Sequence, residues 1–224
     1  AELIYAGLSA AQLAAVYTEV AHSLRARFYM HLAEVDPANY ALALAEVPLG
    51  ISSPANDMLW FHDASPTGQS IWWQFMATRG DISPGSALVE IMKRRIAAGT
   101  EDQARLNFYF TSATGGTTPA DFWGFRPGGT VGMTVAPGID PGDGAGGLYS
   151  GFTFIDGLAT AGDFRHPIIT WAETQLIAAE AAFHAGGAAA AQPYLDAARA
   201  NRVYGSSGGS PVTFPALASV PATL

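Results

Sequence analysis

The sequence predicts a mainly α-helical fold, in which helical hairpins flank a long glycine-rich loop region with few short strands. Two observations support this prediction. Apolar residues recur at three- and four-residue steps near both ends of the chain, the spacing of one helix face. Between these ends, residues 111–166 contain 14 glycines and 4 prolines. That composition excludes long regular elements and predicts extended loop.

The first helical hairpin is expected within residues 1–51. Its first helix carries an apolar stripe formed by Leu13, Val16, Val20, Leu24, Phe28, Leu32 and Val35. Ser9 is the predicted N-cap. The helix should end at Asp36, because proline disfavours helical geometry at the residue before it. A second helix is expected from Pro37 to about Val47, and the antiparallel pair resembles a tetratricopeptide-type repeat.

Residues 52–166 are expected to form a loop-rich ligand region. One helix is predicted there, from Pro84 to Ala98, and Gly99 closes it. Its buried side is expected to comprise Leu88, Ile91, Met92 and Ile96. A long segment without regular structure is unusual inside a compact domain unless it serves a function.

Residues 167–205 predict the second helical hairpin. The helix around 171–183 is apolar nearly all round, which predicts deep burial. A second helix is expected from about Gln192, with Tyr194, Leu195 and Ala198 facing inward. The tail at 206–224 is rich in Ser, Gly and Pro and is expected to be frayed. Together, residues 1–224 are expected to form a single domain.

Composition limits the classes of function. The net charge of −8 and the pI near 4.9 argue against nucleic acid as a partner, because nucleic acids select basic surfaces. The absence of cysteine excludes disulfides, thiolate metal sites and cysteine nucleophiles. Polar residues interrupt every apolar stretch well before 18 residues, so no transmembrane helix is expected.

Three segments resemble the SusD/RagB family of outer-membrane nutrient-binding lipoproteins. Residues 23–33, SLRARFYMHLA, precede 36–45, DPANYALALA, and are similar to the family's "LKARYYLHLA" helix followed by a "YAKAL" helix. Residues 75–82, FMATRGDI, form the second segment. Residues 167–182, PIITWAETQLIAAEAA, resemble the family's late "P-x-x-T-Y-A-E" helix. The order and spacing of the three strings favour this family over chance agreement.

The resemblance implies a helical scaffold that displays long loops for binding an oligosaccharide or polysaccharide. It also implies a TonB-dependent, SusC-like transporter as partner, and a location on the extracellular face of the outer membrane. Family members are usually about twice this long and begin with a lipidated cysteine. The chain is therefore expected to be a truncated member, and its SusD-like domain a partial one.

The candidate ligand-binding residues are aromatic side chains with polar neighbours. An aromatic face can stack on the C–H side of a pyranose, while amides and charged groups bind its hydroxyls. These residues are Trp60, Phe61, Asp63, Gln69 and Trp72, together with Trp123 and Arg126 in the glycine-rich zone. The alternative is that these aromatics, with Trp73 and Phe75, pack in the core or tie the loops to the body.

Other patterns favour structural interpretations, and no cofactor is expected. Glu173 and Glu180 share a helix face and could act as glycosidase acid and base, but pairing with arginines such as Arg25, Arg27 or Arg199 is favoured. A calcium site is conceivable at Asp140, Asp143, Asp156 and Asp163, although turn formation explains these residues equally well.

The expected function is therefore glycan or nutrient binding without catalysis. Two alternatives remain open from the sequence. One is a carbohydrate-active hydrolase or lyase that uses Asp or Glu side chains. The other is a helical-repeat adaptor that binds only protein.

Overall fold

The computed structural model describes residues 2–71, 73–74, 85–99, 103–110, 116–124, 162–207 and 210–213. They belong to two compact units. The first unit comprises the described residues up to Phe61 and from Arg165 to Thr213, and the second those from His62 to Phe164. The mainly α-helical class with few short strands is confirmed. The assignment of residues 1–224 to one domain stays a prediction.

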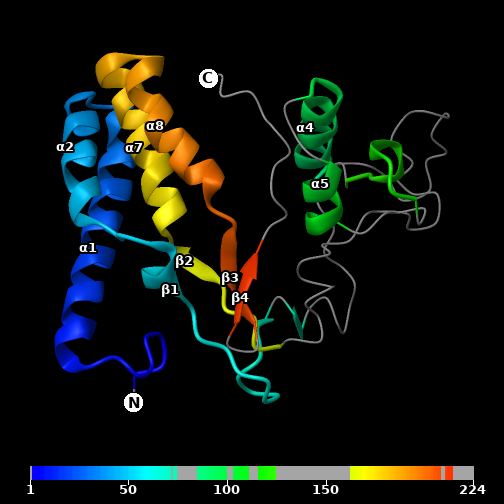
Figure 1. Ribbon diagram of the computed structural model, residues 1–224, viewed down its shortest axis with the longest axis horizontal. Helices are drawn as coiled ribbons and strands as arrows, with labels where there is room; N and C mark the ends of the chain where they lie inside the picture. Colours follow the sequence, from blue (N-terminus) through cyan, green and yellow to red (C-terminus); the bar gives the residue numbers. More distant parts are fainter. Residues whose placement is uncertain are drawn as a thin grey trace. The chain divides into compact units, whose positions relative to one another are not determined.

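Two helical hairpins form the first unit. α1 (Ala10–Ala33) pairs with α2 (Ala38–Glu46), and α7 (Trp171–Gly186) pairs with α8 (Ala188–Ala200). Both α1 and α2 contact α7, so the blue and cyan helices lie beside the yellow and orange ones (Figure 1). The two hairpins expected from the ends of the sequence thus pack against each other. Within the described part of the chain, no helix is long and apolar enough to cross a membrane.

Local sequence signals explain where these helices begin and end. Ser9 is the N-cap of α1, as predicted, and forms a capping box with Gln12: each side chain accepts a hydrogen bond from the other residue's backbone N–H. After α7, Gly187 adopts φ +75°, a left-handed conformation that glycine tolerates best. α8 begins at Ala188, not near Gln192, because a run of four alanines favours helix even with Pro193 inside it.

Small residues dominate the contact between the hairpins. Ala26 of α1, Ala43 of α2, and Ala178 and Ala181 of α7 are fully buried in one cluster. Alanine lets helix backbones approach closely, so larger neighbours are displaced outward. The predicted stripe is therefore wrong in its second half: Phe28 and Leu32 of α1 are exposed, and Val35 is exposed because it lies beyond the end of the helix at Ala33.

Exposure also corrects the prediction that the 171–183 helix is deeply buried on every side. α7 buries one face, which carries Ile177, Ala178, Ala181 and Ala182, whereas Leu176 and Phe183 are about half exposed. Among the described elements, α7 contacts α1, α2, α8 and the short 3-10 turns Val47–Leu49 and Pro54–Asn56, and these contacts leave Leu176 and Phe183 partly open to solvent.

Ion pairs tie α1 to the neighbouring helices. Arg27 binds Glu173 of α7 in a bidentate pair, with Nε–Oε1 and Nη2–Oε2 distances of 2.6 and 2.7 Å. The predicted arginine partner of Glu173 is thus confirmed. On α2, the buried Glu46 contacts Nδ1 of His22 at 2.6 Å and the guanidinium of Arg25 at 2.8 Å. These pairs fix the register of α1 against both neighbours.

Two short antiparallel ladders complete the first unit. β1 (Met58–Leu59) pairs with β2 (Pro167–Ile169), and β3 (Val203–Ser207) pairs with β4 (Ser210–Thr213). The second ladder corrects the expectation of a frayed tail from residue 206, at least as far as Thr213. Backbone pairing stabilises this stretch although its composition suggested disorder.

The second unit has a small core of its own. α4 (Ser86–Ala97) lies beside α5 (Gln103–Tyr109), and Gly99 ends α4 with φ +70°. The buried cluster comprises Val89, Met92, Leu106, Phe110 and Phe122. Of the residues expected on the buried side of α4, Leu88 and Ile91 are instead exposed, because Val89 and Met92 face α5 and the 122–124 loop.

Candidate ligand-binding site

Trp60 lies where β1 leaves the first ladder. Its backbone N–H donates to the carbonyl of His166 at 2.7 Å, which extends the β1–β2 pairing by one hydrogen bond. The backbone is thereby fixed, but the side chain is not buried: 55% of Trp60 is exposed. A large aromatic side chain on a fixed backbone, open to solvent, is suited to stacking against a ligand.

Phe61, the residue after Trp60, is half-buried, and the side chain of Arg165 lies over its ring. The guanidinium of Arg165 lies 4.7 Å from the centre of the Phe61 ring, within the range of a cation–π interaction. The backbone N–H of Arg165 donates to Ser206 of β3 at 2.8 Å. The backbone of Arg165 is thus fixed by its hydrogen bond to β3, and its guanidinium is fixed by the contact with the Phe61 ring. Its guanidinium N–H groups are donors of the kind that hold sugar hydroxyls.

Asp57 is the residue directly before β1, and its side chain lies in the core. It is 5% exposed, and its Oδ1 accepts a hydrogen bond from the Trp171 N–H at 2.7 Å, at the first turn of α7. Its Oδ2 is buried and has no hydrogen-bond partner among the described residues. Burial raises the pKa of Asp57 to about 6, although the bond from Trp171 opposes the shift.

The Asp57 carboxyl should make stability depend on pH. Its pKa is higher in the folded chain than in the unfolded one, so its contribution is present in full below about pH 4 and is lost as the pH rises through about 6. We expect Asp57→Asn to flatten the slope of unfolding free energy between these values, and to be the more stable form at pH 8 by about 1–2 kcal/mol. Urea unfolding at several pH values checks this, with exposed Asp36→Asn as the control. An unchanged slope in Asp57→Asn would contradict the assignment.

Asp63 and Gln69 lie in the second unit, where a tight loop engages their side chains. Oδ1 of Asp63 accepts hydrogen bonds from the backbone N–H and the hydroxyl of Ser65, and these bonds lower the pKa of Asp63. A Cβ on Gly68 would collide with the same carboxylate. Nε2 of Gln69 donates to the carbonyl of Ala64 at 3.2 Å. Both side chains therefore shape the 63–69 loop, whatever they contribute to binding.

The other candidate residues fall in different places. Trp72 and Arg126 lie outside the described residues. Trp73, beside Trp72, is half-buried, and its Nε1 is buried without a hydrogen-bond partner in the described part of the chain. Trp123 is half-buried next to the fully buried Phe122. The burial of Phe122 favours the alternative in which Phe122 and Trp123 anchor their loop by packing against the core. Ligand binding by Trp123 stays a prediction.

The structure adds one residue that sequence reasoning missed. Arg165 is about 100 positions from Phe61 in the sequence, so no local pattern links the two. The only available signal was the position of Arg165 just before the Pro167 segment that pairs with β1. We refer to Trp60, its neighbour in the chain Phe61, and Arg165, which contacts Phe61, as the Trp60 surface.

Metal binding receives no structural support in the described ranges, where no group of three His, Cys, Asp or Glu side chains is placed to hold an ion. Of the four aspartates considered for calcium, Asp140, Asp143 and Asp156 lie outside the described residues, and Asp163 lies within them.

Comparison with known proteins defines the class of fold. No protein-family model matches the sequence, and no curated protein matches it. Solved structures do match, and they show that the chain has a SusD/RagB-like fold, as the sequence strings implied.

Two of these solved structures carry informative descriptions. One is a chitin-binding protein: the identity is 21%, the TM-score 0.60, and the match covers 88% of this chain and 40% of that one. The other is a SusD/RagB family protein from Bacteroides thetaiotaomicron VPI-5482, with 17% identity, a TM-score of 0.59, and coverage of 83% and 36%. The chain thus spans about two fifths of the length of these structures.

Proposed function

We propose that the protein is a non-catalytic glycan-binding protein and that the Trp60 surface contacts the sugar. The observation that carries the proposal is the half-exposed Trp60 indole on a backbone fixed by its hydrogen bond to His166, within a SusD/RagB-like fold. A chitin-binding protein among the solved structures of similar fold supports a carbohydrate as the ligand class.

The chemistry of this surface suits a neutral sugar. The indole face of Trp60 can cover the apolar C–H side of a pyranose, and burying that contact is favourable in water. Arg165 supplies hydrogen-bond donors for hydroxyl or carbonyl oxygens, and its cation–π contact with Phe61 limits its rotamers before ligand arrives. Asp63, Gln69, Trp72, Trp123 and Arg126 remain proposed ligand contacts in the second unit.

The fold class also supports the proposal of a wider role. Proteins that display a glycan-binding surface on a SusD/RagB-like scaffold would work at the outer face of the outer membrane, delivering sugar to a TonB-dependent, SusC-like transporter. We propose this location and this partner for the protein. Co-purification with such a transporter from a native membrane extract supports the role, and its failure leaves the sugar-binding proposal to the experiment below.

Binding to sugar is tested by affinity electrophoresis in gels that contain chitin-derived, starch, xylan or mannan polysaccharides. We expect retardation by at least one of them, and Trp60→Ala should weaken that binding about tenfold or more, equivalent to about 1.4 kcal/mol. Arg165→Ala should weaken it less, because one polar contact at a wet surface contributes less than an aromatic platform.

Matched controls separate loss of contact from loss of fold. Leu42 of α2 is 46% exposed, so Leu42→Ala removes a similarly open apolar side chain and should leave binding unchanged. Release of reducing ends by the wild-type protein would favour the hydrolase alternative. No retardation by any polysaccharide, or equal retardation of Trp60→Ala and wild type, overturns the proposal.

A further inference from the structure

The backbone beneath Trp60 rests on a very short ladder. β1 is two residues long, and its register against β2 shifts between Met58 and Leu59. Trp60 adds one hydrogen bond, from its backbone N–H to the carbonyl of His166. A two-stranded ladder of this length has little stability of its own, so the side chains beside it must help to hold it in place.

Asp57 is a side chain that ties this strand to α7. Its Oδ1 accepts a hydrogen bond from the Trp171 N–H at 2.7 Å, whereas its Oδ2 is buried without a hydrogen-bond partner among the described residues. A buried polar atom without a partner is costly, and the cost is far higher for a carboxylate than for a neutral carboxyl group. The surroundings of Asp57 therefore favour the protonated, neutral form.

The groups that face Asp57 from the N-terminal segment and from α1 supply no positive charge. Burial raises the pKa of Tyr5, and charges that include Asp57 raise it further, so these two side chains lie within electrostatic reach of each other. The Tyr5 hydroxyl stays neutral and donates to the carbonyl of Asn56 at 3.0 Å. Glu19 of α1 is an anion, and it accepts a hydrogen bond from the Asn56 amide at 2.9 Å.

The cations on the α7 and β2 sides are engaged elsewhere. Arg27 forms its bidentate pair with Glu173 in the first turn of α7, and Arg165 lies over the Phe61 ring. His166 precedes β2 and is the other side chain of a type that can change its charge between pH 5 and pH 8. An ionised Asp57 would thus be buried without a counter-charge, and only hydration could stabilise it.

We infer that Asp57 is a positioning residue for the Trp60 surface, and that ionisation of its carboxyl group opens the β1 segment and weakens sugar binding. The neutral carboxyl fits the dry site, whereas the carboxylate becomes hydrated only if the chain around β1 moves outward. This opening breaks the hydrogen bond between Trp60 and His166, so the indole loses its fixed position. The effect on sugar rests on the proposed function, but the opening does not.

The pH range follows from the two environments of the carboxyl group. The pKa of Asp57 is about 6 in the closed form and returns to about 3.8 when the group is hydrated. A group whose pKa is raised in the closed form stabilises that form at low pH, and this stabilisation is lost as the pH rises through 6. The ratio of open to closed chains should therefore increase about tenfold between pH 5 and pH 8.

Hydrogen exchange of the full chain, followed by NMR, tests the opening. After correction for the intrinsic effect of pH on exchange, the amides of Trp60 and Trp171 should lose about tenfold in protection between pH 5 and pH 8. Amides in the middle of α7 should keep theirs, which separates local opening from global unfolding. Asp57→Asn preserves the shape of the side chain and cannot ionise, so its protection should be the same at both pH values.

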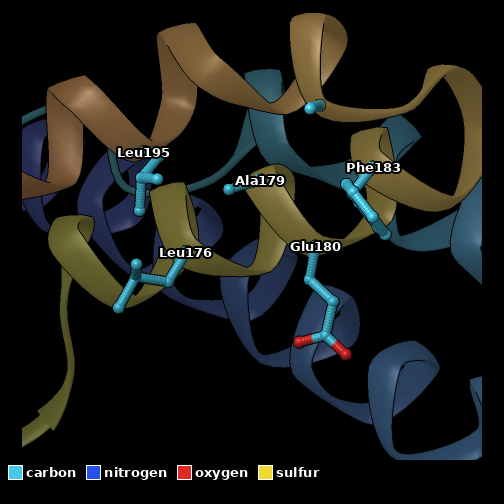
Figure 2. A pocket seen from close by; sticks show the side chains of 6 residues that line it. Leu176, Ala179, Glu180, Phe183 and Leu195 are labelled. Carbon is cyan, nitrogen blue, oxygen red and sulfur yellow. The ribbon is translucent and has the colours of Figure 1, made fainter. Parts of the chain in front are cut away.

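Glu180→Gln is the matched control, because it makes the same chemical change at an exposed carboxylate of α7. Figure 2 shows Glu180 among the side chains that line the groove between α7 and α8, which shares no residue with the Trp60 surface. This variant should lose protection as the wild type does. Wild-type protection that does not change with pH overturns the inference. A pH dependence that persists in Asp57→Asn also overturns it, and assigns the effect to another group such as His166.

Sugar affinity is then measured at pH 5 and pH 8, with chitohexaose as the first probe and oligosaccharides of starch, xylan and mannan after it. The wild type should bind about threefold or more weakly at pH 8, because only closed chains bind, and Asp57→Asn should bind equally at both pH values. Opening without a change in affinity overturns the positioning role. If no oligosaccharide binds at either pH, the proposed function fails, while the exchange data still decide whether Asp57 controls the β1 segment.

Discussion

Replacing Phe122 by alanine should unfold the core of the second unit. Phe122 is 2% exposed and packs with Val89, Met92, Leu106 and Phe110. This small cluster is the apolar contact that holds α4, α5 and the 122–124 loop together. Removal of a buried phenylalanine ring costs about 3–5 kcal/mol, which is a large part of the stability of a small core.

Hydrogen exchange measured by mass spectrometry is the appropriate readout, because the chain has two compact units. We expect amides of α4 and α5 to lose protection in Phe122→Ala, while those of α1 and α7 keep it. Leu88→Ala is the matched control: Leu88 is 49% exposed, so its loss should change protection little. If Leu88→Ala opens α4 as much as Phe122→Ala does, the buried face of α4 has been assigned incorrectly.

Adding one methyl group at Gly50 should destabilise the first unit by about 2–3 kcal/mol. A Cβ there would lie 2.5 Å from Oγ of Ser23 and 3.3 Å from Cγ2 of Thr174. Ser23 cannot move away freely, because its Oγ accepts the hydrogen bond from the Ile51 N–H at 2.9 Å and contacts the Thr174 hydroxyl at 3.0 Å. All of these groups lie where α1, α7 and the end of α2 meet.

A double-mutant cycle isolates this clash. Ser23→Ala alone should cost about 1–2 kcal/mol, since it leaves the buried Ile51 N–H without its acceptor. Combined with Gly50→Ala it should cost less than the sum of the two, because the truncated side chain makes room for the methyl group. Gly85→Ala, where a Cβ meets nothing within 4 Å, serves as the control. Chemical denaturation measures all four variants, and strict additivity would contradict the proposed contact.

Sequence periodicity predicted the hairpins correctly, because an apolar stripe and a cap are local signals. Ser9 and the glycines after α4 and α7 are examples. Periodicity failed where several apolar residues could have occupied the buried face of a helix and tertiary packing determined which of them did. In the second half of α1 the buried residues are Ala26 and Ala33, which permit close helix contact, and Phe28 and Leu32 are left outside. No local rule separates a large apolar residue that is buried from one that a small neighbour displaces.

The candidate site was predicted only in part, for the same physical reason. Trp60 and Phe61 stood out as aromatics with polar neighbours, but Arg165 reaches the Phe61 ring only through the pairing of β1 with β2. Asp63 also appeared as a ligand contact, whereas its hydrogen bonds to Ser65 are local turn chemistry that the Asp-x-Ser spacing could have indicated. The sequence alone does not reveal which distant segments pair, as β1 and β2 do. It does reveal local turn motifs such as Asp-x-Ser.

The central claim is that the Trp60 indole contacts sugar, and the indole N–H signals of ¹⁵N-tryptophan-labelled protein test it most directly. Trp60→Ala assigns the Trp60 signal, and chitohexaose is titrated first, followed by oligosaccharides of the other glycans. The account predicts a saturable shift of the Trp60 signal with at least one of them, while the signal of the half-buried Trp171 stays nearly constant. A Trp60 signal that does not move at saturating concentrations of any oligosaccharide would contradict it.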